Sequence, residues 1–333
     1  MADLMRTDRG VPFLRTGEDA FAGLDGFDLA PRWLEFEGLR LHYVDVGPRD
    51  GPIALLMHGM PTWSFLNRHI IARLTAAGWR CVAADHIGFG RSDKPEDEAW
   101  YRIDRHVAAH RALIAALDLR GVTLFCQDWG GPIGLAQVAE QPARFTRLVI
   151  MNTWLHHETY DYTPALRQWN AQWRPGGLFR ENIPAPLSMG WFMTLPTGHI
   201  QSRDLFAIIH QGEHPPLTAA GEAIRRGYDA PFEGLGVAGF AGPRRFPLCL
   251  PFHDPSAGAA EAQAGWFEAL KAWTGPIHFI WGGADPVFTE AWGRAWAAIY
   301  PQATFDLIAD AGHFLQETHG DEIARILLAH ATA

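Results

Sequence analysis

The chain has 333 residues, 48% of them hydrophobic and 20% charged, a composition that supports a packed core and excludes a largely disordered protein. Its formal net charge is -9 and no Lys/Arg cluster offsets this charge, which argues against a nucleic acid partner. The segment from Met1 to Gly10 is charged and no apolar run follows it, and no run approaches the roughly 18 apolar residues of a membrane helix. The three cysteines are scattered. These features predict a cytoplasmic protein without membrane association.

Short β-rich runs alternate with helical stretches over the first half of the chain, a pattern typical of a mostly parallel sheet covered by helices. An amphipathic helix is predicted from Ile103 to Leu117, and another helix, with Pro132 in its first turn, is predicted to follow Asp128. The strands predicted in this half span residues 39–46, 53–57, 79–84, 122–125 and 148–152.

The alternation of strand-like and helical segments stops from about Trp154 to Phe232, where tryptophans occur among prolines and glycines and no buried strand is evident. Strand-like runs return at 277–281 and 304–308, and an apolar helix is predicted from Asp321 to Ala329. We therefore predict an α/β fold whose core comprises residues 1–153 and 233–333, with a helical cap inserted at 154–232. The four cap tryptophans are Trp154, Trp169, Trp173 and Trp191.

The segment from Phe125 to Gly131 has the layout of a nucleophile elbow, in which a strand turns sharply into a helix. Cys126 and Gly130 occupy the positions that must stay small, so we interpret Cys126 as a packing residue. The residue at the nucleophile position is Asp128. No G-x-S-x-G motif occurs in the chain, which excludes the ordinary serine esterase interpretation.

An acid and a histidine follow the elbow in the order expected for such folds. Asp285 comes after the strand that ends at Trp281, and His313 comes after the strand that ends at Ile308. Loops at the carboxyl ends of parallel strands gather the site in an open α/β sheet. Asp128, Asp285 and His313 are therefore expected to meet there.

At these positions the sequence closely resembles the haloalkane dehalogenases, enzymes with the α/β-hydrolase fold, and most of all the subfamily with an Asp-His-Asp triad and two halide-binding tryptophans. The resemblance covers nearly the whole chain and is weakest in the cap. It is carried by His58-Gly59-Met60-Pro61-Thr62-Trp63-Ser64, Asp85-His86-Ile87-Gly88-Phe89-Gly90-Arg91-Ser92-Asp93-Lys94-Pro95, Gln127-Asp128-Trp129-Gly130-Gly131 and Asp310-Ala311-Gly312-His313-Phe314.

The resemblance implies that Asp128 is the nucleophile, His313 the base and Asp285 the carboxylate that orients the base. It also implies that the backbone N–H groups of Met60 and Trp129 form the oxyanion hole. Relatives often carry Asn or Glu at the position of Met60, whose side chain cannot donate a hydrogen bond.

The same resemblance places the departing halide on the indole of Trp129 and on a second tryptophan from the cap, for which Trp191 is our candidate. It implies a small halogenated aliphatic substrate, water and a halide product, with no metal and no cofactor. We expect a monomer or a weak homo-oligomer.

An aspartate nucleophile suits displacement at an sp3 carbon, because the product is an ester that water can open, whereas an alkylated serine would be a stable ether. The predicted reaction converts a haloalkane to a primary alcohol and halide. An epoxide hydrolase with the same triad is the alternative, since the cap offers tyrosines as the acid. A protein that binds without turnover is a further alternative. The candidate tyrosines are Tyr160, Tyr162 and Tyr228.

Two histidines, His106 and His110, lie four residues apart on the helix predicted from Ile103 to Leu117. This spacing occurs in metal sites, but no third ligand is evident in the sequence. We therefore expect both side chains on a solvated helix face.

Overall fold

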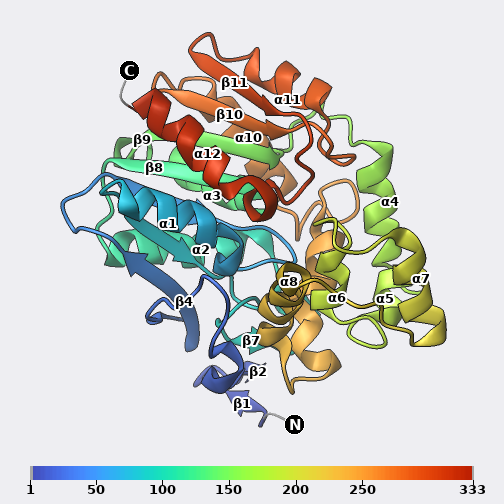
Figure 1. The fold of residues 1–333 in the computed structure, drawn as a ribbon. Coiled ribbons are helices and arrows are strands. Elements are labelled where there is room, and N and C mark those ends of the chain that lie inside the picture. Colours follow the sequence, from blue (N-terminus) through green and yellow to red (C-terminus); the bar gives the residue numbers. More distant parts are fainter. Residues whose placement is uncertain (1–2, 332–333) are drawn as a thin grey trace.

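A computed structural model of the chain describes residues 3–331, so Met1 and Ala2 of the N-terminal segment discussed above lie outside it. Within that range, one large sheet has eight strands in the order β11-β10-β9-β8-β5-β6-β4-β3 (Figure 1). The strands span Arg32–Phe36 (β3), Leu39–Val46 (β4), Ile53–Met57 (β5), Arg80–Ala84 (β6), Val122–Asp128 (β8), Phe145–Thr153 (β9), Ile277–Gly282 (β10) and Ala303–Ile308 (β11).

The sheet is parallel from β6 through β5 and β8 to β11, and antiparallel at the other edge, where β3 pairs with β4 and β4 with β6. This arrangement confirms the predicted fold class. Near the antiparallel edge of the molecule, a second small sheet contains Met5–Arg6 (β1), Pro12–Leu14 (β2) and Lys94–Pro95 (β7).

Helices cover both faces of the large sheet. On one face α1 packs against α12, and on the other α3 packs against α2 and α10. The helices in the ranges predicted to form the core are Arg68–Ala76 (α1), Ile103–Ala116 (α2), Gly130–Glu140 (α3), Ala241–Arg245 (α9), Ala260–Leu270 (α10), Glu290–Ala297 (α11) and Leu315–Ala331 (α12).

Five further helices lie between β9 and β10, in the range expected to form the cap. Four of them, α4 to α7, form a group beside the sheet on the right of Figure 1, next to the carboxyl end of β8 that leads into α3. The division of the chain into core and cap stays a prediction. These helices are Pro164–Gln172 (α4), Leu178–Asn182 (α5), Met189–Thr194 (α6), Ser202–Gln211 (α7) and Ala219–Asp229 (α8).

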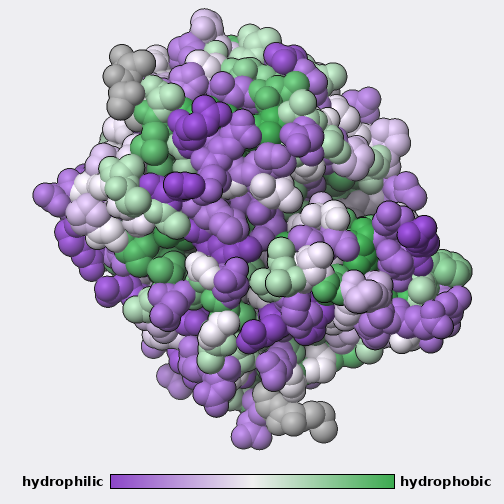
Figure 2. Space-filling model, viewed as in Figure 1, coloured by the Kyte–Doolittle hydropathy of each residue, from purple (hydrophilic) through white to green (hydrophobic). Residues whose placement is uncertain are grey.

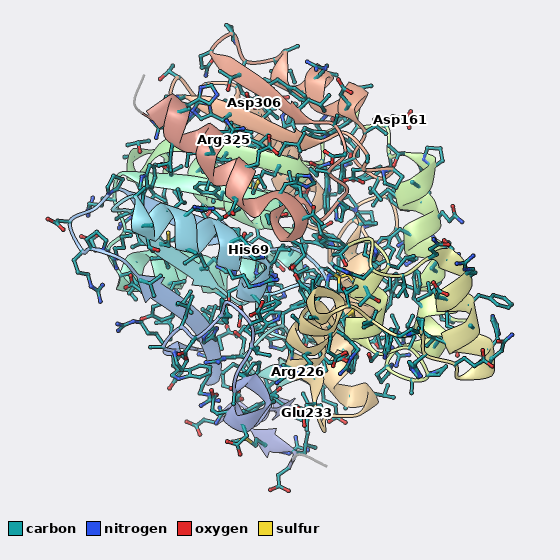
Figure 3. The ribbon with its side chains drawn as sticks, in the orientation of Figure 1. His69, Asp161, Arg226, Glu233, Asp306 and Arg325 are labelled. Carbon is teal, nitrogen blue, oxygen red and sulfur yellow. The ribbon has the colours of Figure 1, made fainter. Side chains whose placement is uncertain are left out.

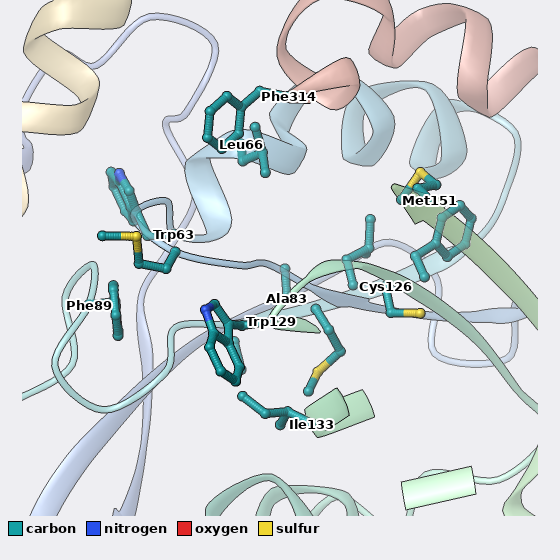
Figure 4. Packing of buried hydrophobic residues seen from close by; sticks show 14 of the residues in the cluster. Trp63, Leu66, Ala83, Phe89, Cys126, Trp129, Ile133, Met151 and Phe314 are labelled. Carbon is teal, nitrogen blue, oxygen red and sulfur yellow. The ribbon is translucent and has the colours of Figure 1, made fainter. Parts of the chain in front are cut away.

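The central strands carry near-continuous apolar sequences because helices bury both of their faces. All seven residues of β8 are buried, as are four of the five in β5. At the carboxyl end of these strands, Trp129, Ile133 and Cys126 contribute to the core that supports the turn into α3 (Figure 4). The packing role predicted for Cys126 agrees with its complete burial.

The face of the molecule seen in Figure 2 is predominantly polar. Hydrophobic areas on the face seen in Figure 2 are small and separated by hydrophilic ones, and the charged side chains of Asp161, Arg226, Glu233 and Arg325 are exposed (Figure 3). Among residues 3–331, no helix is both long and apolar enough to cross a membrane.

The expectation for His106 and His110 was wrong. The helix α2 forms as predicted, but both side chains are buried, at 0% and 1% exposure. They face inward because the segments around His58 and His86 pack against this side of α2, where the rings of His86 and His106 are 5.7 Å apart and those of His86 and His110 are 4.7 Å apart. In the described part of the chain, no group of three or more potential ligands is arranged to hold a metal ion.

Candidate active site

Asp128 lies at the sharp turn between β8 and α3, with a φ of 51°, in the left-handed region that non-glycine residues rarely adopt. The Thr153 hydroxyl holds the turn by donating to the Asp128 carbonyl oxygen at 2.5 Å. No side chain would fit at the nearby positions 130 and 131. A Cβ on Gly130 would lie 2.3 Å from the Met57 carbonyl oxygen, and one on Gly131 would lie 1.9 Å from the Thr153 hydroxyl. This local geometry agrees with the predicted nucleophile elbow.

One oxygen of the Asp128 carboxylate is held by the backbone. The Met60 N–H donates to Asp128 Oδ1 at 2.8 Å. Within residues 3–331 no hydrogen bond joins the Trp129 N–H to this carboxylate, so its role as the second oxyanion donor stays a prediction. Gly59 lets the loop approach this closely, because a Cβ there would lie 2.3 Å from Asp128 Oδ1.

The other oxygen of Asp128 faces His313. The distance from His313 Nε2 to Asp128 Oδ2 is 3.4 Å, and His313 Nδ1 lies 2.8 Å from Asp285 Oδ2. The three residues that the sequence singled out therefore lie together at the carboxyl ends of their strands, with the imidazole between the two carboxylates.

Asn152, at the end of β9, is a residue that the sequence interpretation missed. Its Nδ2 donates to Asp285 Oδ2 at 2.9 Å, and the Val287 N–H donates to Asp285 Oδ1 at 2.7 Å. Both oxygens of Asp285 thus have donors, which fixes the carboxylate against His313. A polar residue closing an apolar strand was the available signal.

The protonation of His313 follows from these neighbours. Burial lowers its pKa, but the charge of Asp285 and the hydrogen bonds with Asp128 and Asp285 outweigh burial and raise the pKa to about 10. The resting site therefore holds a protonated imidazole between two carboxylates.

A cavity of about 330 Å³ opens over Asp128, and its walls are mostly apolar. Such a lining favours a small uncharged ligand with little hydrogen-bonding capacity. The cavity is lined by Met60, Asp128, Trp129, Trp154, Leu166, Trp169, Phe192, Pro196, Leu250, Ala284, Pro286, Val287, Gly312, His313 and Phe314.

Trp191 is absent from this lining, and its ring packs instead on His214 with the centroids 4.8 Å apart. Trp191 lies on α6, but the residue of this helix that faces the cavity is the next one, Phe192. Successive residues of a helix point about 100° apart, so a shift of one position turns a side chain off the cavity face.

Trp169 on α4 lies in the cavity wall where Trp191 was expected. It stands three residues after Leu166, which also lines the cavity, and this helical spacing was the signal that could have identified it. Among the described residues, neither the Trp129 nor the Trp169 indole N–H has a hydrogen-bond acceptor. Both donors are therefore free to bind an anion.

The fold and the elbow together define a hydrolase class. The model of a family described as alpha/beta hydrolase fold matches residues 52–320, and the chain belongs to that family.

Similarity to named proteins narrows the class further. The chain is 36% identical over 326 residues to a haloalkane dehalogenase of Psychrobacter cryohalolentis, covering 96% of this chain and 97% of that protein. It is also 36% identical over 326 residues to a haloalkane dehalogenase of Mycolicibacterium paratuberculosis, covering 95% and 97%. This chain belongs to the haloalkane dehalogenase family.

A solved structure agrees with this assignment. The haloalkane dehalogenase DpaA of Paraglaciecola agarilytica superposes with a TM-score of 0.80 at 32% identity, covering 95% of this chain and 98% of that one. That structure is described as tetrameric, a larger assembly than the monomer or weak homo-oligomer expected here. The oligomeric state of this chain stays a prediction.

Proposed function

We propose that this chain hydrolyses small haloalkanes to an alcohol and a halide through a covalent ester on Asp128. The observation that carries the proposal is the setting of Asp128: a carboxylate on an elbow, with a backbone N–H on one oxygen, a histidine beside the other, and an apolar cavity in front of it.

In the first step Asp128 Oδ2 attacks the carbon that bears the halogen, because Oδ1 is already occupied by the Met60 N–H. A carbon–oxygen bond forms and the carbon–halogen bond breaks, with its electron pair leaving on the halide. The indole N–H groups of Trp129 and Trp169 then receive the halide. An indole donates without accepting, so it suits an anion that needs no proton.

In the second step water attacks the carbonyl carbon of the ester, and His313 Nε2 takes the proton from that water. The negative charge of the tetrahedral intermediate develops on Oδ1, where the Met60 N–H stabilises it. Collapse of the intermediate breaks the bond from the carbonyl carbon to the alkoxy oxygen, and that oxygen takes up the remaining proton of the attacking water. This restores the Asp128 carboxylate and releases the alcohol. Asp285, held by Asn152 and Val287, keeps the imidazole oriented throughout.

The cavity gives little support to the epoxide hydrolase alternative. An opened epoxide leaves as an alkoxide and needs an acid, yet Tyr160, Tyr162 and Tyr228 all lie outside the cavity lining. The Tyr228 hydroxyl donates to Glu317 at 2.7 Å, and that of Tyr162 lies 2.9 Å from His156 Nδ1.

The test is to trap the ester. His313→Gln removes the base and leaves the nucleophile, so incubation with 1-bromobutane should leave a butyl ester on the peptide that contains Asp128, detected by mass spectrometry. The double variant Asp128→Ala/His313→Gln is the matched control and should stay unmodified.

Two outcomes would contradict the proposal. An unmodified peptide in an active His313→Gln protein would exclude the covalent route. Rapid diol formation from styrene oxide by the wild-type protein, without bromide release from 1-bromobutane, would favour the epoxide hydrolase instead, and turnover of neither substrate would favour the binding protein.

A further inference from the structure

The peptide unit that joins Gly59 to Met60 is held from both ends. Its N–H, from Met60, donates to Asp128 Oδ1. Its oxygen, on Gly59, is contacted at 2.8 Å by His58 Nδ1, at 3.0 Å by the Thr62 backbone N–H and at 2.9 Å by the Thr62 hydroxyl. Donors on a carbonyl oxygen polarise the amide and strengthen its N–H as a donor.

The hydrogen bonds of His58 define its tautomer. The backbone N–H of His86 donates to His58 Nε2 at 2.9 Å, so that nitrogen carries a lone pair. The proton of the neutral ring must then be on Nδ1, from which it is donated to the Gly59 oxygen.

The rings of His86 and His110 form a second chain of hydrogen bonds, which ends on the His58 carbonyl rather than on the Gly59 carbonyl. His86 Nε2 lies 2.7 Å from the His58 carbonyl oxygen, which can only accept, so Nε2 carries the proton of His86. His86 Nδ1 therefore accepts, and its partner at 2.6 Å, His110 Nε2, must be the donor. Burial lowers the pKa of each ring, that of His58 below its usual value, that of His86 well below it and that of His110 to about 3, in agreement with three neutral rings.

We infer that His110, acting through His86 on the His58 carbonyl, and Thr62, acting on the Gly59 carbonyl, are positioning residues that aim the Met60 N–H for hydrolysis of the ester on Asp128, and that Thr62 also polarises this N–H. This inference rests on the proposed function. The network holds two consecutive carbonyl groups, those of His58 and Gly59. The peptide unit that carries the Met60 N–H therefore has little freedom to tilt relative to Asp128.

The two chemical steps should depend on this N–H to different degrees. During ester formation Asp128 loses negative charge, so a stronger donor on Oδ1 gives no advantage. During hydrolysis Oδ1 becomes an oxyanion, and the donor gains strength as the charge develops. A weakened network should therefore slow the second step and spare the first.

The chain offers a matched pair of variants for the test. His110→Leu removes the donor to His86. His106→Leu removes a ring of equal size one helical turn earlier, also fully buried, whose two nitrogens have no hydrogen-bond partner among the described residues. Each variant should lose stability through similar changes in packing, which thermal unfolding will verify.

Rapid chemical quench during turnover of 1-bromobutane measures the fraction of Asp128 present as ester, and single-turnover bromide release measures its formation. In His110→Leu we expect ester hydrolysis to slow about threefold to tenfold, less than the hundredfold or more typical of losing an oxyanion donor itself. The ester should accumulate while bromide release in the first turnover stays within about twofold of wild type. His106→Leu should leave both steps unchanged.

Conservative replacements should restore the second step. In His110→Gln the amide can again donate to His86, and hydrolysis should recover towards wild type. A second series, independent of the histidines, is Thr62→Val, which removes the hydroxyl without changing the shape of the side chain, and Thr62→Ser, which keeps it. Only Thr62→Val should accumulate ester.

The results separate failure of the inference from failure of the proposed function. Lack of ester in the His313→Gln protein overturns the proposed function. If that protein does form the ester but hydrolysis is equally fast in His110→Leu, Thr62→Val and wild type, the positioning role alone is overturned. Equal slowing of both steps in His110→Leu and His106→Leu would also overturn it, because it would indicate a general packing effect.

Discussion

Replacing Trp169 by phenylalanine tests which cap residue receives the halide. The substitution removes the indole N–H and keeps an aromatic ring among its neighbours Trp173, Phe179 and Phe192. A hydrogen bond to a charged group contributes about 1.5–3 kcal/mol net. Its loss corresponds to roughly a ten- to hundredfold change in a rate or an affinity.

Two measurements check this expectation. The first is single-turnover bromide release from 1-bromobutane, which should slow by the factor given above because the leaving halide has lost one of two donors. The second is bromide binding, followed by quenching of tryptophan fluorescence, which should weaken by a similar factor. Trp191→Phe is the matched control and should change neither measurement by more than about twofold, because that ring packs on His214 outside the cavity.

The opposite pattern would refute the reasoning. If Trp191→Phe lost bromide affinity and Trp169→Phe kept it, the donor would come from α6, and the assignment from the cavity lining would be wrong. If neither variant lost affinity, neither Trp169 nor Trp191 would hold the halide, and the donors would be sought among the other indoles of the cavity, Trp129 and Trp154.

Three further outcomes are expected. Asn152 and Val287 donate to the two oxygens of Asp285, so in Asp285→Asn the new amide N–H₂ must face a donor. The imidazole should then lose its orientation, and ester hydrolysis should slow by about a hundredfold or more in quench assays. Tyr228→Phe removes the hydrogen bond to Glu317 and should lower the free energy of unfolding by about 1–2 kcal/mol in urea titrations, while bromide release is retained. Because the folded-state pKa of His313 is raised from 6.5 to about 10, its contribution to stability is complete below about pH 6.5 and is lost as the pH rises through 10. The unfolding temperature should therefore fall more between pH 7 and pH 10 in wild type than in His313→Gln.

The core of the fold could be predicted because its strands are continuous apolar runs with turn residues at their ends. The bounds of β4 and β5 agree with the prediction to the residue, and β8 and β9 extend beyond it. The edge strand β3 was missed. Three of its five residues are half-buried and two are exposed, without regular alternation, so the segment lacks a clear strand pattern.

The proximity of Asp128, Asp285 and His313 could be predicted because each of them comes at the end of a strand or after it, and parallel strands bring their carboxyl ends to one edge of the sheet. The cap residues follow no such rule. Whether Trp169 or Trp191 reaches the cavity depends on the rotation of a short helix, which is set by packing against other cap helices. The burial of His106 and His110 escaped prediction for a similar reason, because their partners His58 and His86 are distant in sequence.

The charges around His313 also order the two proposed steps. A protonated imidazole cannot accept a proton from water, and in the resting site both carboxylates favour that protonated form. Esterification makes Asp128 neutral, which removes one of these carboxylates while burial still opposes the charged ring. The pKa of His313 must therefore fall when the ester forms, and the imidazole becomes a base at the step that requires one. A serine at position 128 would be uncharged before and after alkylation and could not couple the two events.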